Sequence, residues 1–190
     1  AIVPHLGRLA SEYPGITLEV VADEGFANIV EQGFDAGIRL GEDLHNDMRA
    51  VRLTPDLRFA IVATPDYFQR HGEPTHPQDL LQHRCIGWRK ASSGERYKWA
   101  FQQGEQRFSV AVNSPLIVDD ARLLLQAALA HVGIAFAIEQ EVEEHLASGR
   151  LRRVLADWCA PFPGFYLYYP NRRNHSVALA TVIELLRLPT

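Results

Sequence analysis

Asp119 and Asp120 are adjacent carboxylates at the head of a long apolar segment, and paired carboxylates are the groups that general acid–base catalysis uses. The segment that follows, residues 121–132, is apolar on nearly every side, which predicts a buried helix. Asp is a preferred residue for capping a helix start, where its charge also suits the helix dipole. We therefore interpret the pair as caps rather than as an acid and a base. The free N–H groups of such a helix start also suit contact with an anion.

Arg39 lies between Ile38 and Leu40 in an apolar stretch that ends at Gly41. A guanidinium in that position must reach solvent or meet a negative charge. One interpretation is an ion pair with Asp35, Glu42 or another acidic neighbour. The other is that its fork of N–H donors holds an anionic ligand in bidentate fashion.

The remaining reactive residue types point away from catalysis. His71, His76 and His83 fall in a turn-rich stretch without the spacing of a zinc site, so we expect surface histidines. Cys85 and Cys159 have apolar neighbours, which is typical of buried, inert thiols. No nucleotide-binding, nucleophile-elbow or zinc-protease motif occurs. We expect no enzyme activity, no metal and no cofactor.

Composition narrows the class of protein further. The 190 residues carry a formal charge of −4, which is the wrong sign for a surface that neutralises DNA phosphates. Two cysteines without a CxxC pair favour a reducing, cytoplasmic compartment. No apolar run approaches the roughly 20 residues of a membrane helix, and no basic-then-apolar leader pattern stands at the start of the sequence. We expect a cytoplasmic protein with no membrane partner.

The elements that would position these side chains follow an α/β pattern. A helix over residues 2–13 begins without a capping segment, so we interpret the chain as part of a longer protein. Residues 16–21, a helical stripe from Phe26 to Phe34 and residues 35–41 predict a βαβ unit with a parallel sheet. Strands are expected at 49–53, 57–63, 85–88, 134–138, 151–155 and 165–170, and a hairpin at 99–101 and 108–112. Helices are expected at 121–132 (closed by Gly133) and at 139–147, and a closing helix that begins near residue 177 should stop at Pro189.

Several segments in this order resemble one known family. They read YPGITLE (13–19), GFDAGIRLG (33–41), ATPDY (63–67), HGEP (71–74), PQDL (77–80), HRCI (83–86), AALAHVGIA (127–135) and YPNRR (169–173). Together they resemble the effector-binding domain of LysR-type transcriptional regulators, from residue 1 to about residue 187. The ordered set is much more specific than any single motif.

The resemblance implies the type 2 periplasmic-binding-protein fold, with two α/β lobes joined by two crossover segments. Lobe I would contain residues 1–64 and 166–190, and lobe II residues 65–165, with crossovers near 63–64 and 165–166. It further implies that an N-terminal winged helix-turn-helix and a linker helix precede this chain and are absent from it. DNA would be contacted only through that missing domain.

The family's ligand cleft lies between the lobes, and carrying it over by position gives Ala63, Thr64, Val118, Asp119, Phe136 and Tyr168, to which we add Arg39. Ligands of open α/β sheets also collect beyond the carboxyl ends of the strands. The expected ligand is a small, anionic effector that is bound and not transformed.

The family also pairs its effector domains antiparallel, which places the 2–13 helix of one copy against the 119–132 region of the other. We therefore expect a homodimer, and a homotetramer of the full-length protein. A periplasmic-type solute-binding protein shares the fold and remains the alternative. An enzyme on the same scaffold would need a catalytic set that the sequence does not supply.

Overall fold

The computed structural model describes residues 2–22, 29, 31–41, 48–90, 93–171 and 175–189. Its chain divides into two compact units. Unit 1 contains residues 1–57 and 162–190, and unit 2 contains residues 58–161. The boundaries expected from the sequence, after residues 64 and 165, fall several residues later in the chain.

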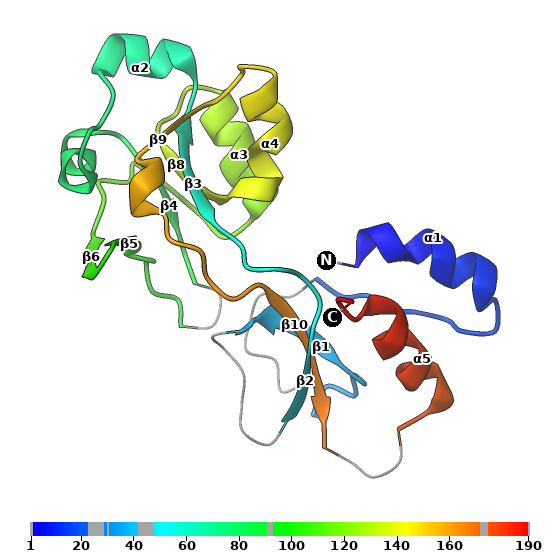
Figure 1. The fold of residues 1–190 in the computed structure, drawn as a ribbon. Coiled ribbons are helices and arrows are strands. Elements are labelled where there is room, and N and C mark those ends of the chain that lie inside the picture. Colours follow the sequence, from blue (N-terminus) through cyan, green and yellow to red (C-terminus); the bar gives the residue numbers. More distant parts are fainter. Residues whose placement is uncertain are drawn as a thin grey trace. The chain divides into compact units, whose positions relative to one another are not determined.

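Unit 1 is a three-stranded sheet with a pair of helices on one face (Figure 1). The strand order is β1-β10-β2, and β10 is antiparallel to both neighbours. Leu9 of one helix and Val182 and Ile183 of the other pack with Leu167 of the central strand in one core. The bounds are α1 Val3–Glu12, β1 Gly37–Leu40, β2 Met48–Arg52, β10 Phe165–Pro170 and α5 Val177–Leu186.

The expected βαβ unit is not formed in the described part of unit 1. Residues 16–22 have no regular secondary structure, although a strand was predicted at 16–21. The helix predicted from Phe26 to Phe34 lies mostly outside the described residues, and 31–33 form a turn. The strand predicted at 35–41 is present as β1, but it pairs antiparallel with β10. An alternating pattern predicts an extended chain, and it does not identify the neighbouring strand.

Unit 2 has a central sheet covered on both faces. β3 lies between β8 and β9 and is antiparallel to both, while β4 and β7 are parallel, and a parallel bridge from Cys85 to Ile134 connects the two groups. The bounds are β3 Phe59–Ala63, α2 Pro65–His71, η2 Pro77–Gln82, β4 Ile86–Trp88, β5 Trp99–Gln103, β6 Gln106–Val110, β7 Leu116–Val118, α3 Ala121–Leu129, β8 Ala135–Ile138, α4 Glu139–Ala147, β9 Arg152–Val154 and η3 Ala156–Trp158.

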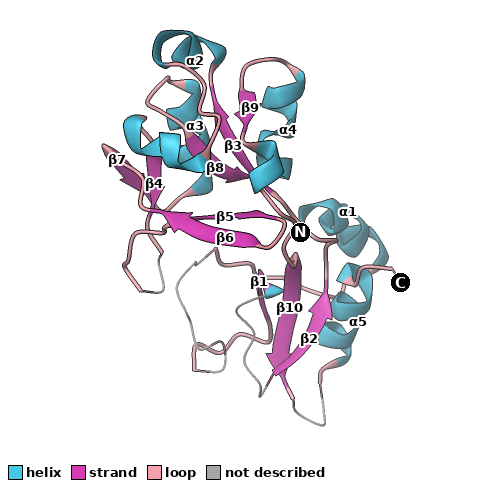
Figure 2. Cartoon of the chain, turned by 60° about the vertical axis from the view of Figure 1, so that its left-hand side comes forward, coloured by secondary structure: helices cyan, strands magenta, loops and turns pink. Residues whose placement is uncertain are grey.

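Strand β3 shows how the two layers arise. Its residues alternate between faces: Ala60 and Val62 join a core with residues of α3 and α4, and Ile61 and Ala63 join a core with α2 and the β5–β6 hairpin. A strand buried on both faces was predicted at residues 57–63, and the structure confirms it for residues 59–63. The predicted hairpin is also present, with Gly104 at its tip in a left-handed conformation (Figure 2).

The helix predicted over residues 121–132 ends earlier than expected. α3 stops at Leu129, and His131 takes the left-handed conformation that was assigned to Gly133. A side chain on Gly133 would overlap the carbonyl oxygen of Arg84. Gly133 is thus required for close approach to a neighbouring segment and does not end the helix.

Candidate functional site

Arg39 and Tyr168 meet on the sheet of unit 1. The guanidinium carbon of Arg39 lies over the Tyr168 ring, 5.5 Å from its centroid, which is a cation–π distance. The Tyr168 ring lies against Gly37, its cross-strand partner, where a Cβ atom would overlap the ring. Tyr168 is 8% exposed. The two sequence-predicted site residues of unit 1 are therefore brought together.

Val118 and Asp119 lie at the carboxyl end of β7, next to the start of α3. The Asp120 carboxylate accepts a hydrogen bond of 2.8 Å from the Leu123 backbone N–H, so Asp120 is the helix cap. The neighbouring Asp119 is exposed. The capping role expected for the pair thus belongs to Asp120.

Ala63 and Thr64 lie at the carboxyl end of β3, which is the opposite end of the unit 2 strands from Val118. Val118 pairs with Trp88, and the parallel bridge between Cys85 and Ile134 fixes the register of β8 against β4. The antiparallel pairing of Val62 with Ala135 then places Ala63 beside the beginning of β8, whereas Val118 is level with its end. The structure does not bring these two pairs of predicted residues together.

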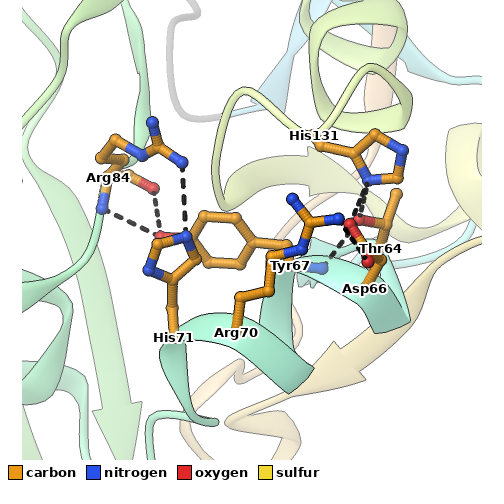
Figure 3. A network of polar contacts seen from close by, with 7 residues as sticks. All are labelled: Thr64, Asp66, Tyr67, Arg70, His71, Arg84 and His131. Atoms are coloured by element: carbon orange, nitrogen blue, oxygen red, sulfur yellow. Dashed lines mark hydrogen bonds and ion pairs between the residues drawn. The ribbon is translucent and has the colours of Figure 1, made fainter.

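Thr64 has a structural role at this end of β3. Its hydroxyl accepts a hydrogen bond of 3.2 Å from the Tyr67 N–H and caps α2 (Figure 3). Its Oγ1 atom also lies 2.7 Å from Nδ1 of His131, and the same ring nitrogen lies 3.6 Å from a carboxylate oxygen of Asp66. These contacts join the start of α2 to the turn that follows α3.

Phe136 is part of the aromatic core of unit 2. It is 8% exposed. Its ring centroid lies 4.3 Å from that of Phe59, 5.2 Å from Trp99 and 5.9 Å from Tyr97. These contacts are those of a side chain that packs the interior.

A second polar cluster surrounds Tyr67, and sequence reasoning missed it. The Tyr67 hydroxyl accepts a hydrogen bond of 3.0 Å from the Arg84 N–H and donates one of 3.2 Å to the Arg84 carbonyl oxygen (Figure 3). Burial raises the pKa of Tyr67 above its ordinary value. The Arg84 guanidinium reaches Nε2 of His71 at 3.3 Å.

His83 corrects one prediction from the sequence. It was expected at the surface with His71 and His76, yet it is 8% exposed, with Nδ1 at 3.5 Å from the Tyr67 hydroxyl. Burial lowers the pKa of His83, and the nearby His71 adds to this effect. Among the described residues, no three His, Cys, Asp or Glu side chains gather closely enough to hold a metal ion.

Both cysteines are buried free thiols, as the sequence predicted. Burial raises the pKa of Cys85 to about 12 and that of Cys159 to about 11. Since the thiolate is the reactive form, neither sulfur is activated as a nucleophile.

A shallow groove of about 320 Å³ on unit 2 contains none of the predicted site residues. Its lining includes Arg153, whose guanidinium pairs with Glu139. The lining residues are Glu73, Pro74, Thr75 and residues 153–158.

The family model and the relatives that match this chain identify the same family. The family model described as "LysR substrate binding domain" matches residues 1–188. A putative transcriptional regulator of Pseudomonas aeruginosa is 45% identical over 98% of this chain and 61% of its own length. The uncharacterized HTH-type transcriptional regulator YcaN of Escherichia coli is 39% identical over 93% of this chain and 57% of its own length. The chain thus spans only part of these relatives.

Solved structures agree on the fold. The regulatory domain of AphB from Vibrio vulnificus matches 97% of this chain and 90% of its own, with a TM-score of 0.81 and 22% identity. The LysR-type regulator CrgA from Neisseria meningitidis matches 97% of this chain and 63% of its own, with a TM-score of 0.80 and 26% identity. The fold is the type 2 periplasmic-binding α/β fold that the motifs implied. No helix among the described residues has the length and apolar character needed to cross a membrane. The chain belongs to the family of LysR substrate-binding domains, the regulatory domains of LysR-type transcriptional regulators.

Proposed function

We propose that this chain is the effector-sensing domain of a cytoplasmic transcriptional regulator, and that it binds a small anionic metabolite without transforming it. The observation that carries the anionic part of the proposal is the Arg39 guanidinium held against the Tyr168 ring. A guanidinium is planar and permanently charged, and its fork of N–H donors has the geometry that matches a carboxylate or phosphate.

The proposed ligand contacts are Arg39 and Tyr168 on unit 1 and Val118 and Asp119 on unit 2. Asp119 directly precedes Asp120, the N-cap of α3, and the positive end of a helix dipole suits an anion. Ala63 and Thr64 are left out of the proposal because they lie at the opposite end of the unit 2 strands from Val118. Phe136 is left out because it packs the aromatic core.

Sensing without catalysis is supported by the chemistry of the reactive groups. The thiols of Cys85 and Cys159 have raised pKa values, and the Asp120 carboxylate caps a helix. The relatives are named as transcriptional regulators, which favours this function over that of a periplasmic solute-binding protein.

In the full-length protein, we propose, an N-terminal winged helix-turn-helix contacts DNA, and the effector domains form a homodimer within a homotetramer. The ligand acts by favouring one relative arrangement of the units and thereby changing the geometry of the assembly. Such coupling usually amounts to about 1–3 kcal/mol and is reciprocal between ligand and DNA.

A thermal-shift screen of the chain with a panel of small mono- and dicarboxylates, sugar phosphates and neutral amides tests this function. A ligand that binds the folded state but not the unfolded chain stabilises the fold by RT ln(1 + [L]/Kd), so Tm rises with the logarithm of its concentration above Kd. We expect stabilisation by at least one anion, and mass spectrometry should recover that anion unchanged. Stabilisation by neutral compounds alone, or turnover of the bound compound, would contradict the proposal.

A further inference from the structure

We propose that unit 2 carries a self-association contact in which a basic hairpin of one copy docks on the acidic helix α4 of a second copy. The basic hairpin is the chain between β4 and β5, of which residues 89–90 and 93–98 are described. This contact is separate from the proposed pairing of α1 with α3, and it does not depend on the proposed ligand.

Two arginines face each other directly across the hairpin. Arg89 and Arg96 form an antiparallel bridge. Backbone hydrogen bonds of 2.8 and 2.9 Å join the residues on either side of this bridge, from Tyr97 to Trp88 and from Lys90 to the residue opposite it. The arginines are thus a non-hydrogen-bonded pair, the kind in which opposite side chains come closest. Like charges in such a pair destabilise a hairpin.

The surrounding fold supplies no counter-charge to this hairpin. Both arginines and Lys98 are exposed, and Nη1 of Arg89 donates a hydrogen bond of 2.7 Å to a neutral acceptor, the Gly94 carbonyl oxygen. The Glu95 side chain points to the opposite face from that of Arg96, because neighbouring residues alternate. Within the part of the chain that the structure describes, none of the three cations forms an ion pair with a carboxylate. We name Arg89, Arg96 and Lys98 the basic patch.

Helix α4 carries the complementary charge. Glu143 and Glu144 are exposed, and neither forms an ion pair among the described residues. Glu139 and Glu141 lie in the first turn, where a carboxylate suits the helix dipole. Glu143 and Glu144 lie beyond that turn, towards the negative end of the helix. The stability of α4 therefore does not account for these two charges, which we name the acidic patch.

The topology of unit 2 allows two copies to exchange these contacts. Strands β4 and β8 run parallel through the bridge between Cys85 and Ile134. The hairpin follows the carboxyl end of β4, and α4 follows the carboxyl end of β8, so both leave the same end of the sheet. Two copies related by a two-fold axis can then form the contact twice, with each basic patch against the acidic patch of the other copy.

A second copy explains more of this surface than nucleic acid does. Duplex DNA would occupy the basic patch alone and leave the acidic patch without a partner. The acidic patch on the same unit and the formal charge of −4 also repel phosphates. Complementary patches steer association and fix which surfaces meet, so the pair of patches is explained by one contact.

Charge exchange tests the contact, with self-association of the chain measured by sedimentation velocity at low salt. Arg89→Glu/Arg96→Glu makes the hairpin acidic, and Glu143→Arg/Glu144→Arg makes α4 basic. Each variant should self-associate about tenfold or more weakly than the wild type, because like charges then meet. An equimolar mixture of the two should regain the association of the wild type, since every patch in the mixed pair again meets the opposite charge. Added salt should weaken association of the wild type, because it screens exposed charges.

Arg70→Glu/Arg107→Glu is the matched control, because it changes the net charge equally on α2 and β6 of the same unit, outside the basic patch. It should associate as the wild type does, and circular dichroism should show that each variant is folded. Where the reversed hairpin fails to fold, Arg89→Gln/Arg96→Gln removes the repulsion between the arginines and should still weaken association.

A mixture that associates no better than its two components would overturn the inference. The same holds for equal weakening by the control, for a wild type whose association is absent or independent of salt, and for duplex DNA of unrelated sequence that the wild type binds and Arg89→Glu/Arg96→Glu does not. The pairing of α1 with α3 is apolar and is not weakened by salt, so its own test is decided separately.

Discussion

The carbonyl oxygen of Arg84 occupies the space that a side chain at Gly133 would need. The contact joins the segment before β4 to the segment before β8, and the Ile134 N–H donates a hydrogen bond of 2.9 Å to the same carbonyl. An added methyl group must push the two backbones apart and weaken this hydrogen bond. The close approach therefore maintains the connection between the two groups of strands in unit 2.

Gly133→Ala should accordingly lower the free energy of unfolding by about 1–3 kcal/mol, the usual cost of overpacking. Gly7→Ala is the control, because Gly7 lies within α1 and nothing lies within 4 Å of its ideal Cβ. It should raise stability by about 0.5–1 kcal/mol, since Ala favours the helix. Urea denaturation measures both effects, and a neutral Gly133→Ala would show that the two segments separate easily.

Asp119 and Asp120 are neighbours with different roles, and matched substitutions separate them. Asp120→Ala removes the cap of α3 and should cost about 1 kcal/mol of stability. Asp119→Ala removes an exposed carboxylate and should leave the urea midpoint nearly unchanged, while raising the affinity for the anion found in the thermal-shift screen, because a like charge beside that anion is removed. If both substitutions reduced stability equally, the assignment of the cap to Asp120 alone would be wrong.

The sequence predicted most elements of unit 2 because their signals are local. Strand β3, the β5–β6 hairpin and α3 follow from apolar runs, turn glycines and a capping aspartate. The contacts of Gly133 and the register that separates Ala63 from Val118 depend on residues distant in the chain. No local pattern contains that information. The role of Gly133, and the end of the unit 2 strands at which Thr64 lies, could therefore not be predicted.

The site of unit 1 was partly predictable for the same reason. Arg39 stood out as a charge in an apolar strand, and the family motif identified Tyr168. The position of Tyr166 opposite Arg39 could not be predicted, because it comes from the pairing of β1 with β10, which are distant in the chain. The sequence did contain one signal for this packing, a glycine two residues before Arg39 and another two residues after it. The structure gives the reason, because the tyrosine rings lie against Gly37 and Gly41.

Exposed apolar side chains on α1 and α3 predict the proposed dimer contact. Val3 is 74% exposed and Leu123 is 52% exposed, although both belong to helices that bury their other faces. Leu123→Glu should weaken self-association by about tenfold or more, because a charge would have to be desolvated in the interface. Sedimentation velocity over a concentration series measures the change.

Leu81→Glu is the matched control for the dimer contact, because Leu81 is 50% exposed but lies on η2, away from both helices in sequence. It should leave the sedimentation profile of the wild type unchanged. A wild-type chain that stays monomeric at every concentration, or equal effects of the two glutamates, would contradict the proposed pairing of α1 with α3.

His83 should make the stability of unit 2 sensitive to acid. Its pKa is lowered in the folded state, chiefly by burial and then by the charge of His71, while Asp79 acts in the opposite direction. The unfolded chain, with an ordinary histidine pKa of about 6.5, then binds a proton more readily than the folded chain. The stability contributed by neutral His83 is thus complete above about pH 6.5 and decreases as the pH falls below that value.

The free energy of unfolding should therefore fall as the pH is lowered below about 6.5, with a slope of up to about 1.4 kcal/mol per pH unit from this residue. His83→Gln removes the titrating group and keeps a polar side chain near the Tyr67 hydroxyl, so its profile should be flatter across this range. His5→Gln is the control, because His5 lies on α1 in unit 1 and should leave the slope as in wild type. Parallel profiles for wild type and His83→Gln would show that the acid sensitivity arises from other groups.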